Sequence, residues 1–294
     1  MKSLGRRIPN PFPFEDPMKN ARLLITSDLS PGATSENTLE ALVEQMAGRE
    51  PAAVVIAGNL GESIRDLETV LKMFQKKLGC PLGFVPGNQD LFFQENLTSQ
   101  NLWTHALRQK VEALGIRYLQ TSTLEIGSTV VTGSIGWYDY SSAVPELERT
   151  QEYWIQSKLD HNVPDALRID WEWSDQEFAT LVNRSLSATL DSLESDPKTS
   201  EVVVVTHFPV FEWQLPPVFT APGAENFNRV LRAYQGNLNL GLEILQRRKV
   251  RHVVSAHVGF EGYRSLAKPD GSLAKSYLTG SSPSTPAFTE IGLS

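Results

Sequence analysis

Short runs of β-branched and aliphatic residues alternate, in the first third of the chain, with stretches whose apolar positions recur at helical spacing. The runs RLLITSD (22–28), AAVVIAGN (52–59) and LGFVPGN (82–88) are nearly continuous in apolar residues, and each ends in small or polar residues. Between them, the apolar residues of 37–48 and 63–77 recur at intervals of three and four. Continuous apolar strands that alternate with amphipathic helices are typical of a buried parallel sheet. The pattern therefore predicts an α/β protein that begins β-α-β-α-β.

The remainder of the chain continues this pattern. We expect a helix at about 101–114, strands near 116–120, 123–127 and 129–134, a long helix over 174–195, strands at 201–207 and 250–257 separated by helix within 224–248, and a last strand near 276–280. Ser174 and Glu177 have the spacing of a capping box, which marks where the long helix begins. The tail 280–290 is rich in serine and proline and is predicted to be irregular. We expect an irregular N-terminal arm over 1–20 and a single domain over 21–294.

Residues 137–173 do not fit either period throughout, although they contain four of the six tryptophans. Two interpretations remain open for this Trp-rich insertion. It forms a lobe that overhangs a ligand site, since long insertions in compact domains tend to be functional, or it forms a satellite hydrophobic cluster beneath a loop. In the first case Trp137, Tyr138 and Asp139 are candidates for contact with a ligand.

The formal net charge is −7 and the chain has a single cysteine, Cys80. The negative charge argues against nucleic acid or an anionic membrane as a partner, and one cysteine cannot form an internal disulfide. No apolar run approaches the ~18 residues that span a bilayer, and the first residues lack the apolar core of a signal peptide. We therefore expect a cytoplasmic protein.

Five predicted strands end in polar residues that carry lone pairs. The endings are Ser27-Asp28-Leu29-Ser30, Gly58-Asn59-Leu60-Gly61, Gly87-Asn88-Gln89-Asp90, Thr206-His207-Phe208-Pro209 and Ala256-His257-Val258-Gly259. In a largely parallel sheet, ligand-handling residues gather beyond the carboxyl ends of the strands. A single Asn or His at such a place is usually a turn residue or a helix cap, but five together favour one shared site.

The order and spacing of these endings resemble the calcineurin-like metallophosphoesterases, over about residues 22–260. The family's blocks run Asp-x-His, Gly-Asp-x-x-(Asp/Glu), Gly-Asn-His-(Asp/Glu), a later strand-end His and Gly-His-x-His. GSIGWYDYS (133–141) is also similar to a segment of some bacterial members. The resemblance implies a four-layer α/β fold, a β-sandwich of two mixed sheets flanked by helices, with two divalent metals at one edge. Such a metal pair activates a bridging water for attack on a phosphoryl group, and a histidine protonates the leaving group.

Compared block by block with the family pattern, the chain departs from it at four positions. The matching residues are Asp28, Glu62, Asn88, Asp90, His207 and His257. The replaced residues are Ser30 and Gly259, where the family has metal-binding histidines, Asn59, where it has the bridging aspartate, and Gln89, where it has the proton-donating histidine. The resemblance thus implies metal ligands at Asp28, Asn59, Asn88, His207 and His257, and a general-acid position at Gln89 supported by Asp90.

These four replacements remove metal-binding side chains, including the charged bridging carboxylate, and the side chain that would donate a proton. The first metal would keep Asp28 as its only strong ligand, whereas the second would have four neutral donors. Gln89 cannot donate a proton near neutral pH, which costs ~10²–10⁴ in rate. We therefore expect no tightly bound cofactor and at most one weakly bound divalent metal (Mn, Zn, Fe or Mg). The remaining histidines His105, His161 and His252 are interpreted as surface, boundary or core residues.

The main hypothesis is a catalytically inactive or severely impaired member that acts by binding, as a scaffold or as a sensor of a phosphorylated small molecule. In an alternative hypothesis, the protein is an enzyme that slowly hydrolyses phosphate mono- or diesters with a single metal. A third hypothesis makes the Trp-rich insertion the binding surface for an unidentified protein.

Overall fold

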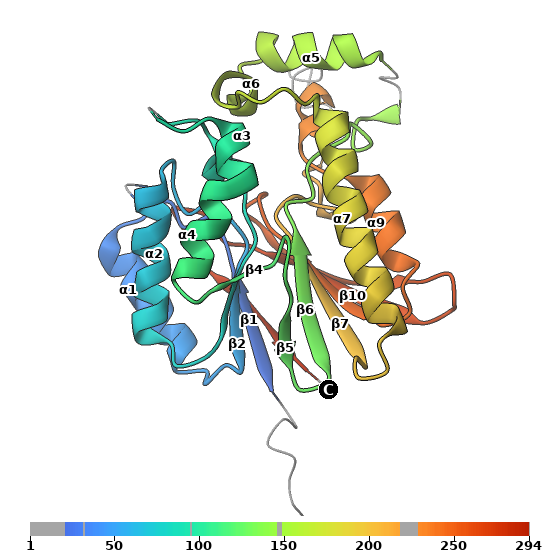
Figure 1. The fold of residues 1–294 in the computed structure, drawn as a ribbon. Coiled ribbons are helices and arrows are strands. Elements are labelled where there is room, and N and C mark those ends of the chain that lie inside the picture. Colours follow the sequence, from blue (N-terminus) through green and yellow to red (C-terminus); the bar gives the residue numbers. More distant parts are fainter. Residues whose placement is uncertain (1–20, 32, 95, 146–148, 218–228, 294) are drawn as a thin grey trace, which may run out of the picture.

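The computed structural model describes residues 21–31, 33–94, 96–145, 149–217 and 229–293. The predicted N-terminal arm, residues 1–20, lies outside these ranges. Two β-sheets lie face to face, with strand orders β11-β1-β2-β3-β4 and β5-β6-β7-β8-β10-β9 (Figure 1). Both sheets are mixed, and helices flank them on either side, which confirms the predicted sandwich.

The five-stranded sheet is built from the apolar runs at the start of the chain. Its strands are β1 (Arg22–Thr26), β2 (Ala53–Ile56), β3 (Leu82–Phe84), β4 (Arg117–Tyr118) and β11 (Phe288–Gly292). Its outer face is covered by α1 (Glu36–Ala47), α2 (Ile64–Lys77), the short α3 (Ser99–Asn101) and α4 (Leu107–Ala113) (Figure 1). Leu24 and Val54 pack beneath these helices, whereas Ile25 and Val55 face the other sheet. Burial on both faces explains why these strands are continuous apolar runs.

The six-stranded sheet forms the other half of the sandwich. Its strands are β5 (Leu124–Ile126), β6 (Thr129–Ser134), β7 (Glu201–Thr206), β8 (Val250–Ser255), β9 (Glu261–Ala267) and β10 (Leu273–Thr279). Helices α7 (Asp175–Ser195) and α9 (Leu238–Leu245) cover its outer face. Val203 and Val205 of β7 face the first sheet, while Val202 and Val204 pack beneath the helices.

Two strands were not predicted from the sequence. The tail expected to be irregular contains β11, which pairs antiparallel with β1 from Phe288 opposite Thr26 to Gly292 opposite Arg22. Strand β9 pairs with β10 at the edge of its sheet and is largely exposed. Neither segment has an apolar run, because β11 lies at a sheet edge and β9 has little of its surface buried.

The helical predictions need smaller corrections. The helix expected at 101–114 contains a π-helical turn, Leu102–Ala106, between α3 and α4. Within 224–248, the described part from 229 onward holds a 3₁₀ turn, Arg232–Tyr234, and the short α9. The capping box of Ser174 and Glu177 is confirmed at the start of α7. None of the described helices is long and apolar enough to cross a membrane.

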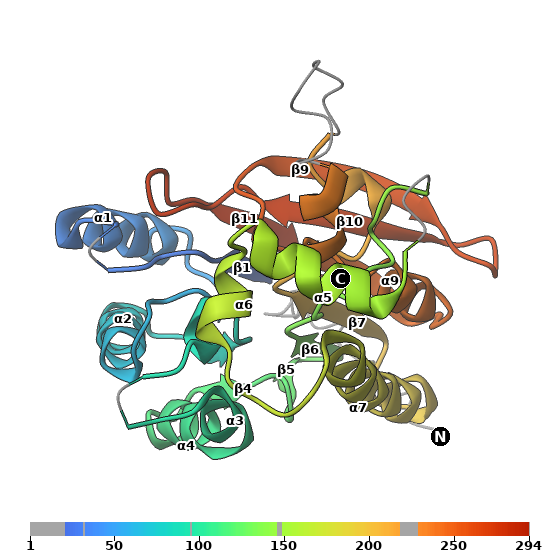
Figure 2. The ribbon, with the colours of Figure 1, turned by 90° about the horizontal axis from the view of Figure 1, so that it is seen from above.

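The Trp-rich insertion lies over the ends of the strands, and its buried aromatic rings join the main hydrophobic core instead of forming a satellite cluster. Helices α5 (Gln151–Asp160) and α6 (Pro164–Arg168) lie across the ends of the strands when the molecule is seen from above (Figure 2). Beneath them, the Trp137 and Tyr138 rings are fully buried and pack against Phe208. The expectation that these two side chains meet a ligand is therefore wrong, because they belong to the main hydrophobic core.

The capping box at the start of α7 can be tested directly by mutation. The Ser174 hydroxyl accepts the backbone N–H of Glu177, and the Glu177 carboxylate accepts the backbone N–H of Ser174 at 2.8 Å. Replacing Ser174→Ala removes one of these caps and should lower the free energy of unfolding by about 1 kcal/mol. Urea denaturation measures the effect. Ser185→Ala, at an exposed mid-helix position, should not destabilise, and an equal loss in both variants would contradict the role of the cap.

Candidate functional site

The ends of five strands meet beneath α5 and α6. Asp28 follows β1, Asn59 follows β2, Asn88 follows β3, His207 follows β7 and His257 follows β8. The Asn59 side-chain amide lies 2.9 Å from Asp28 Oδ1. His207 Nε2 lies 3.2 Å from both Asn88 Oδ1 and His257 Nδ1. The structure thus brings together side chains from both sheets that are up to 229 residues apart in sequence.

Unusual backbone conformations accompany this convergence. Asp28, Asn59 and His257 have φ values of 55°, 58° and 72°, in the left-handed region that costs a non-glycine residue about 1 kcal/mol or more. The neighbouring loops leave no room for side chains, since a Cβ added to Gly87 would lie 2.3 Å from Asn59 Oδ1. Several such outliers in one place are typical of functional sites in proteins.

Asp90 holds the loops after β2 and β3 together. Its carboxylate accepts the backbone N–H groups of Asn59, Leu60 and Gly87, each at 2.8 Å. Burial raises the pKa of Asp90 to about 7, and these three hydrogen bonds act in the opposite direction. Because all three donors are backbone groups, Asp90 fixes the geometry of these loops.

Asp28, Ser30, Asn59 and Gln89 form a connected network of side-chain and backbone hydrogen bonds. The Asn59 Nδ2 group donates to Asp28 Oδ1, and Asn59 Oδ1 accepts the backbone N–H of Gln89 at 3.0 Å. These two bonds fix the orientation of the Asn59 amide. The Ser30 hydroxyl lies 3.3 Å from Gln89 Oε1 and from the Asn59 carbonyl oxygen. Burial raises the pKa of Asp28, while its hydrogen bonds and the nearby His257 oppose the rise.

His207, Asn88 and His257 form a second group beside this network. The His207 Nδ1 atom lies 2.7 Å from the Ala57 carbonyl oxygen, which can only accept, so Nδ1 carries the proton and Nε2 presents a lone pair. This lone pair faces Asn88 Oδ1, which is also an acceptor. Burial lowers the pKa of His207 to about 4, and burial together with His207 lowers that of His257 to about 3. Both rings are therefore neutral at pH 7.

Asp165 is a site residue that the sequence analysis missed. It is the second residue of α6, and its carboxylate accepts Asn88 Nδ2 at 2.8 Å and the Tyr138 hydroxyl at 3.1 Å. Only 4% of Asp165 is exposed, and burial raises its pKa. The Asn88 amide is thereby held with its oxygen toward His207. No local motif marks Asp165, since its role depends on how the insertion folds back over the strands.

A cavity of about 330 Å³ opens between this group and the insertion. Asn88, Gln89 and His257 lie on one side of it, and its other walls are lined by Phe92, His161, Asn162, Val163, Pro164, Asp165, Leu231, Tyr234 and Gln235. Among the residues that the structure describes, no lysine or arginine lines it. His161, interpreted from the sequence as a boundary residue, is therefore at the cavity wall, whereas His105 is exposed and His252 is buried elsewhere.

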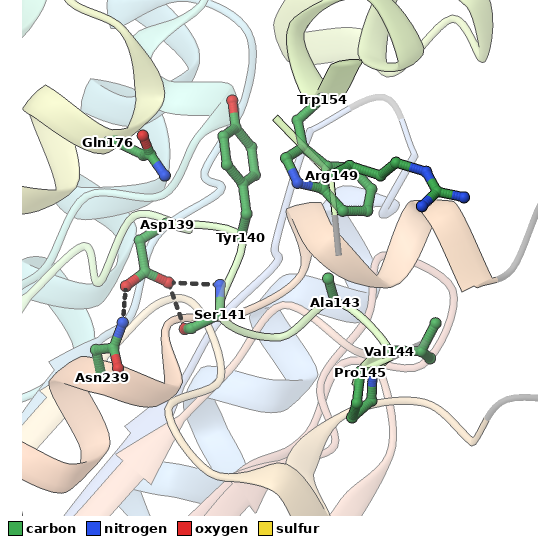
Figure 3. A pocket seen from close by; sticks show the side chains of 10 residues that line it. All are labelled: Asp139, Tyr140, Ser141, Ala143, Val144, Pro145, Arg149, Trp154, Gln176 and Asn239. Carbon is green, nitrogen blue, oxygen red and sulfur yellow. Dashed lines mark hydrogen bonds between the residues drawn. The ribbon is translucent and has the colours of Figure 1, made fainter. Parts of the chain in front are cut away.

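The other predicted positions lie away from the cavity. Glu62 is exposed and forms an ion pair with Arg168 of α6 at 3.1 Å, and Gly259 is exposed with a φ of 68°. Asp139 lines a separate hollow with Tyr140 (Figure 3), where its carboxylate accepts the amide of Asn239 and the backbone N–H of Ser141.

The donor atoms limit what this arrangement can bind. Among the residues that the structure describes, no group of three or more His, Cys, Asp or Glu side chains is placed to hold a metal ion. His207 Nε2 lies 3.2 Å from both Asn88 Oδ1 and His257 Nδ1, and His257 Nδ1 either donates a proton to His207 or offers a lone pair to a cation, depending on its tautomer. Neither Gln89 nor Ser30 can serve as a general acid near neutral pH.

Comparisons with known proteins agree with this architecture. The structure resembles that of a phosphopantetheinyl hydrolase from Mycobacterium tuberculosis, with a TM-score of 0.64 and 16% identity over 89% of each chain. It also resembles a dimetal phosphatase from Danio rerio, with a TM-score of 0.54 and 16% identity over 94% of this chain and 93% of that one. A search of functionally curated proteins found no significant match. The family profile described as calcineurin-like phosphoesterase matches residues 21–259. The chain therefore belongs to the calcineurin-like phosphoesterase family.

Proposed function

We propose that this family member has lost dimetal catalysis and acts by binding a ligand or partner at the strand ends. The observation that carries the proposal is the hydrogen-bond network of Asp28, Ser30, Asn59 and Gln89. Three of these residues replace family metal ligands or the family proton donor, and they satisfy one another. Such mutual satisfaction is expected of residues that have adapted to a site without the metal pair.

The orientation of Asn59 is the strongest part of this argument. A bridging ligand must direct a lone pair at each metal, but Asn59 directs an N–H group at Asp28 and uses its oxygen for the backbone of Gln89. The amide thus supplies Asp28 with the positive partner that a cation would supply. The residues at the first metal position therefore do not fit a divalent ion, and we derive no catalytic step through one.

The cavity beneath the insertion is the proposed binding place. Its amides and aromatic rings offer hydrogen bonds and apolar contact, but the described part of its lining has no Lys or Arg to neutralise a phosphate dianion. A protein segment or the uncharged part of a phosphorylated molecule therefore fits it better than free phosphate. Nucleic acid and membranes remain poor candidates because of the charge of −7.

One observation favours a second candidate function, a slow phosphoesterase with a single metal. Two acceptors, His207 Nε2 and Asn88 Oδ1, lie only 3.2 Å apart, and His257 Nδ1 lies at the same distance from His207. Facing lone pairs repel unless a proton or cation lies between them. Two imidazoles and an amide oxygen suit zinc better than magnesium.

The hydrogen-bond network around Asn59 predicts that the Asn59→Asp variant, measured in the absence of metal, is less stable than the wild type. The change replaces the N–H donor by a second buried carboxylate beside Asp28, and we expect a loss of about 3 kcal/mol at pH 8. Mutual repulsion raises the pKa of this pair above that of the unfolded chain, so the unfolded state binds fewer protons. Stability then falls as pH rises, and the loss should be smaller at pH 5.

Urea denaturation at pH 5 and pH 8, in the presence of a chelator, measures this difference. Asn101→Asp makes the same chemical change at an exposed position and should alter stability by no more than about 0.5 kcal/mol at either pH. A loss in Asn59→Asp that is the same at both pH values would contradict the proposed contact with Asp28.

Wild-type protein supplied with Mn²⁺ should hydrolyse p-nitrophenyl phosphate and bis(p-nitrophenyl) phosphate no faster than the buffer does. The combined variant Ser30→His, Asn59→Asp, Gln89→His and Gly259→His should bind manganese and gain turnover. The side chain added at 259 has space, since its Cβ would meet only Ser282 Cβ at 3.7 Å, although the left-handed backbone there costs about 1 kcal/mol. Adding His207→Ala to this variant should abolish the gain. Turnover by the wild type that is lost in His207→Ala would overturn the proposal.

Calorimetric titration with Zn²⁺ separates the two candidate functions. For a catalytically silent protein we expect binding weaker than about 100 µM. One equivalent bound with a Kd below about 1 µM would instead support the single-metal enzyme. That binding should be lost in His257→Ala and kept in His105→Ala, which changes an exposed ring.

A further inference from the structure

A further hollow, of about 390 Å³, lies at the opposite end of the six-stranded sheet from the strand-end site. It is lined by residues from the beginnings of β7, β8 and β10 and the end of β9, whereas His207 and His257 follow the ends of β7 and β8. The two places are therefore separated by the length of the strands, and a ligand in one does not contact the other.

A β-bulge places two neighbouring residues of β8 in this hollow. Val202 of β7 pairs with Val250, but Val203 pairs with His252, so that Arg251 is an extra residue in β8. Without the bulge, Arg251 and His252 would point to opposite faces of the sheet. With it, both line the hollow. Bulges of this kind commonly redirect a side chain at a functional place.

A second cation lies next to this pair. Lys275 of β10 is the register partner of His252, and Ser265 of β9 is the register partner of Lys275. All of these residues line the same hollow. Arg251 and Lys275 are exposed, and among the ion pairs of the described residues none includes either. Two unpaired like charges on adjacent strands are unfavourable, in a chain whose net charge is −7.

One acid, Glu201, lines the hollow itself, and a second, Asp270, lies near Arg251, but both are already engaged. Glu201 is buried and lies 3.0 Å from His252 Nε2, while His252 Nδ1 lies 3.2 Å from the Tyr277 hydroxyl. The Ser272 hydroxyl and backbone N–H hold the Asp270 carboxylate and lower its pKa, and the charges of Lys268 and Arg251 act in the same direction. The two cations therefore remain available to a ligand.

We propose that this hollow binds the oxyanion group, phosphate or carboxylate, of a small molecule between Arg251 and Lys275. The planar guanidinium of Arg251 donates two parallel hydrogen bonds to such a group, and the Lys275 ammonium adds a second charge. Ser265 Oγ, now 3.0 Å from the Tyr263 hydroxyl, provides a further donor by rotation. The proposal does not depend on whether the strand-end site is catalytic.

The test is an NMR titration of ¹⁵N-labelled protein with inorganic phosphate, and separately with succinate, at constant ionic strength. Binding should shift the amide signals of residues 200–201, 251–252, 265 and 273–275 in a saturable way, and leave those of Gln89 and His257 in place. Arg251→Gln with Lys275→Gln should weaken the affinity at least tenfold. The charge-preserving variant, Arg251→Lys with Lys275→Arg, should keep part of it.

Arg65→Gln with Lys198→Gln removes the same charge from exposed positions elsewhere and serves as the matched control. Saturable binding that survives in the control and is lost in the variant Arg251→Gln with Lys275→Gln supports the proposal. Whether phosphate or succinate binds more tightly distinguishes a phosphorylated ligand from a carboxylic acid. Shifts that are scattered over the surface, that do not saturate, or that weaken equally in the control would overturn it. Thermal melts of each variant verify that the fold is unchanged.

Discussion

The side-chain hydrogen bond from Asn59 to Asp28 is the contact on which the arrangement of the strand ends depends. A carboxylate as buried as Asp28 is costly unless a positive or hydrogen-bonding group lies against it. The Asn59 amide provides that group, and its oxygen in turn accepts the backbone of Gln89. One amide therefore links the ends of β1, β2 and β3.

The loops around this contact are held by groups that serve no ligand directly. Asp90 ties three backbone N–H groups together, and the close approach of the loops requires glycine at 58 and 87. Asp165, in the insertion that covers the strand ends, accepts a hydrogen bond from the Asn88 side chain and thereby sets the orientation of its amide. The insertion is thus a fixed wall of the cavity, anchored also by the buried ion pair of Lys158 and Asp175 at 3.0 Å. These contacts hold the shape of the strand ends through groups of the protein itself.

Much of the fold follows from the periodicity of the sequence. The apolar runs that form β1, β2, β3 and β7 are buried on both faces, so each is nearly continuous in apolar residues and easily recognised. The two missed strands, β9 and β11, lie at sheet edges and are stabilised by pairing with their neighbours. Pairing of this kind depends on where another segment of the chain lies, and a local pattern does not record it.

The two candidate sites show the same difference between what a local pattern predicts and what distant segments decide. The sequence alone determined which polar residues follow the strands, and so which side chains gather beyond the carboxyl edge of the parallel strands. Only the tertiary structure decided that Asn59 turns its N–H toward Asp28, that Asp165 holds Asn88, that Trp137 and Tyr138 are buried, and that Arg251 shares a face with His252. Each of these outcomes is a choice between orientations of similar local energy. The choice is made by hydrogen-bond and packing partners that lie far away in the sequence, which is why residue order by itself does not reveal it.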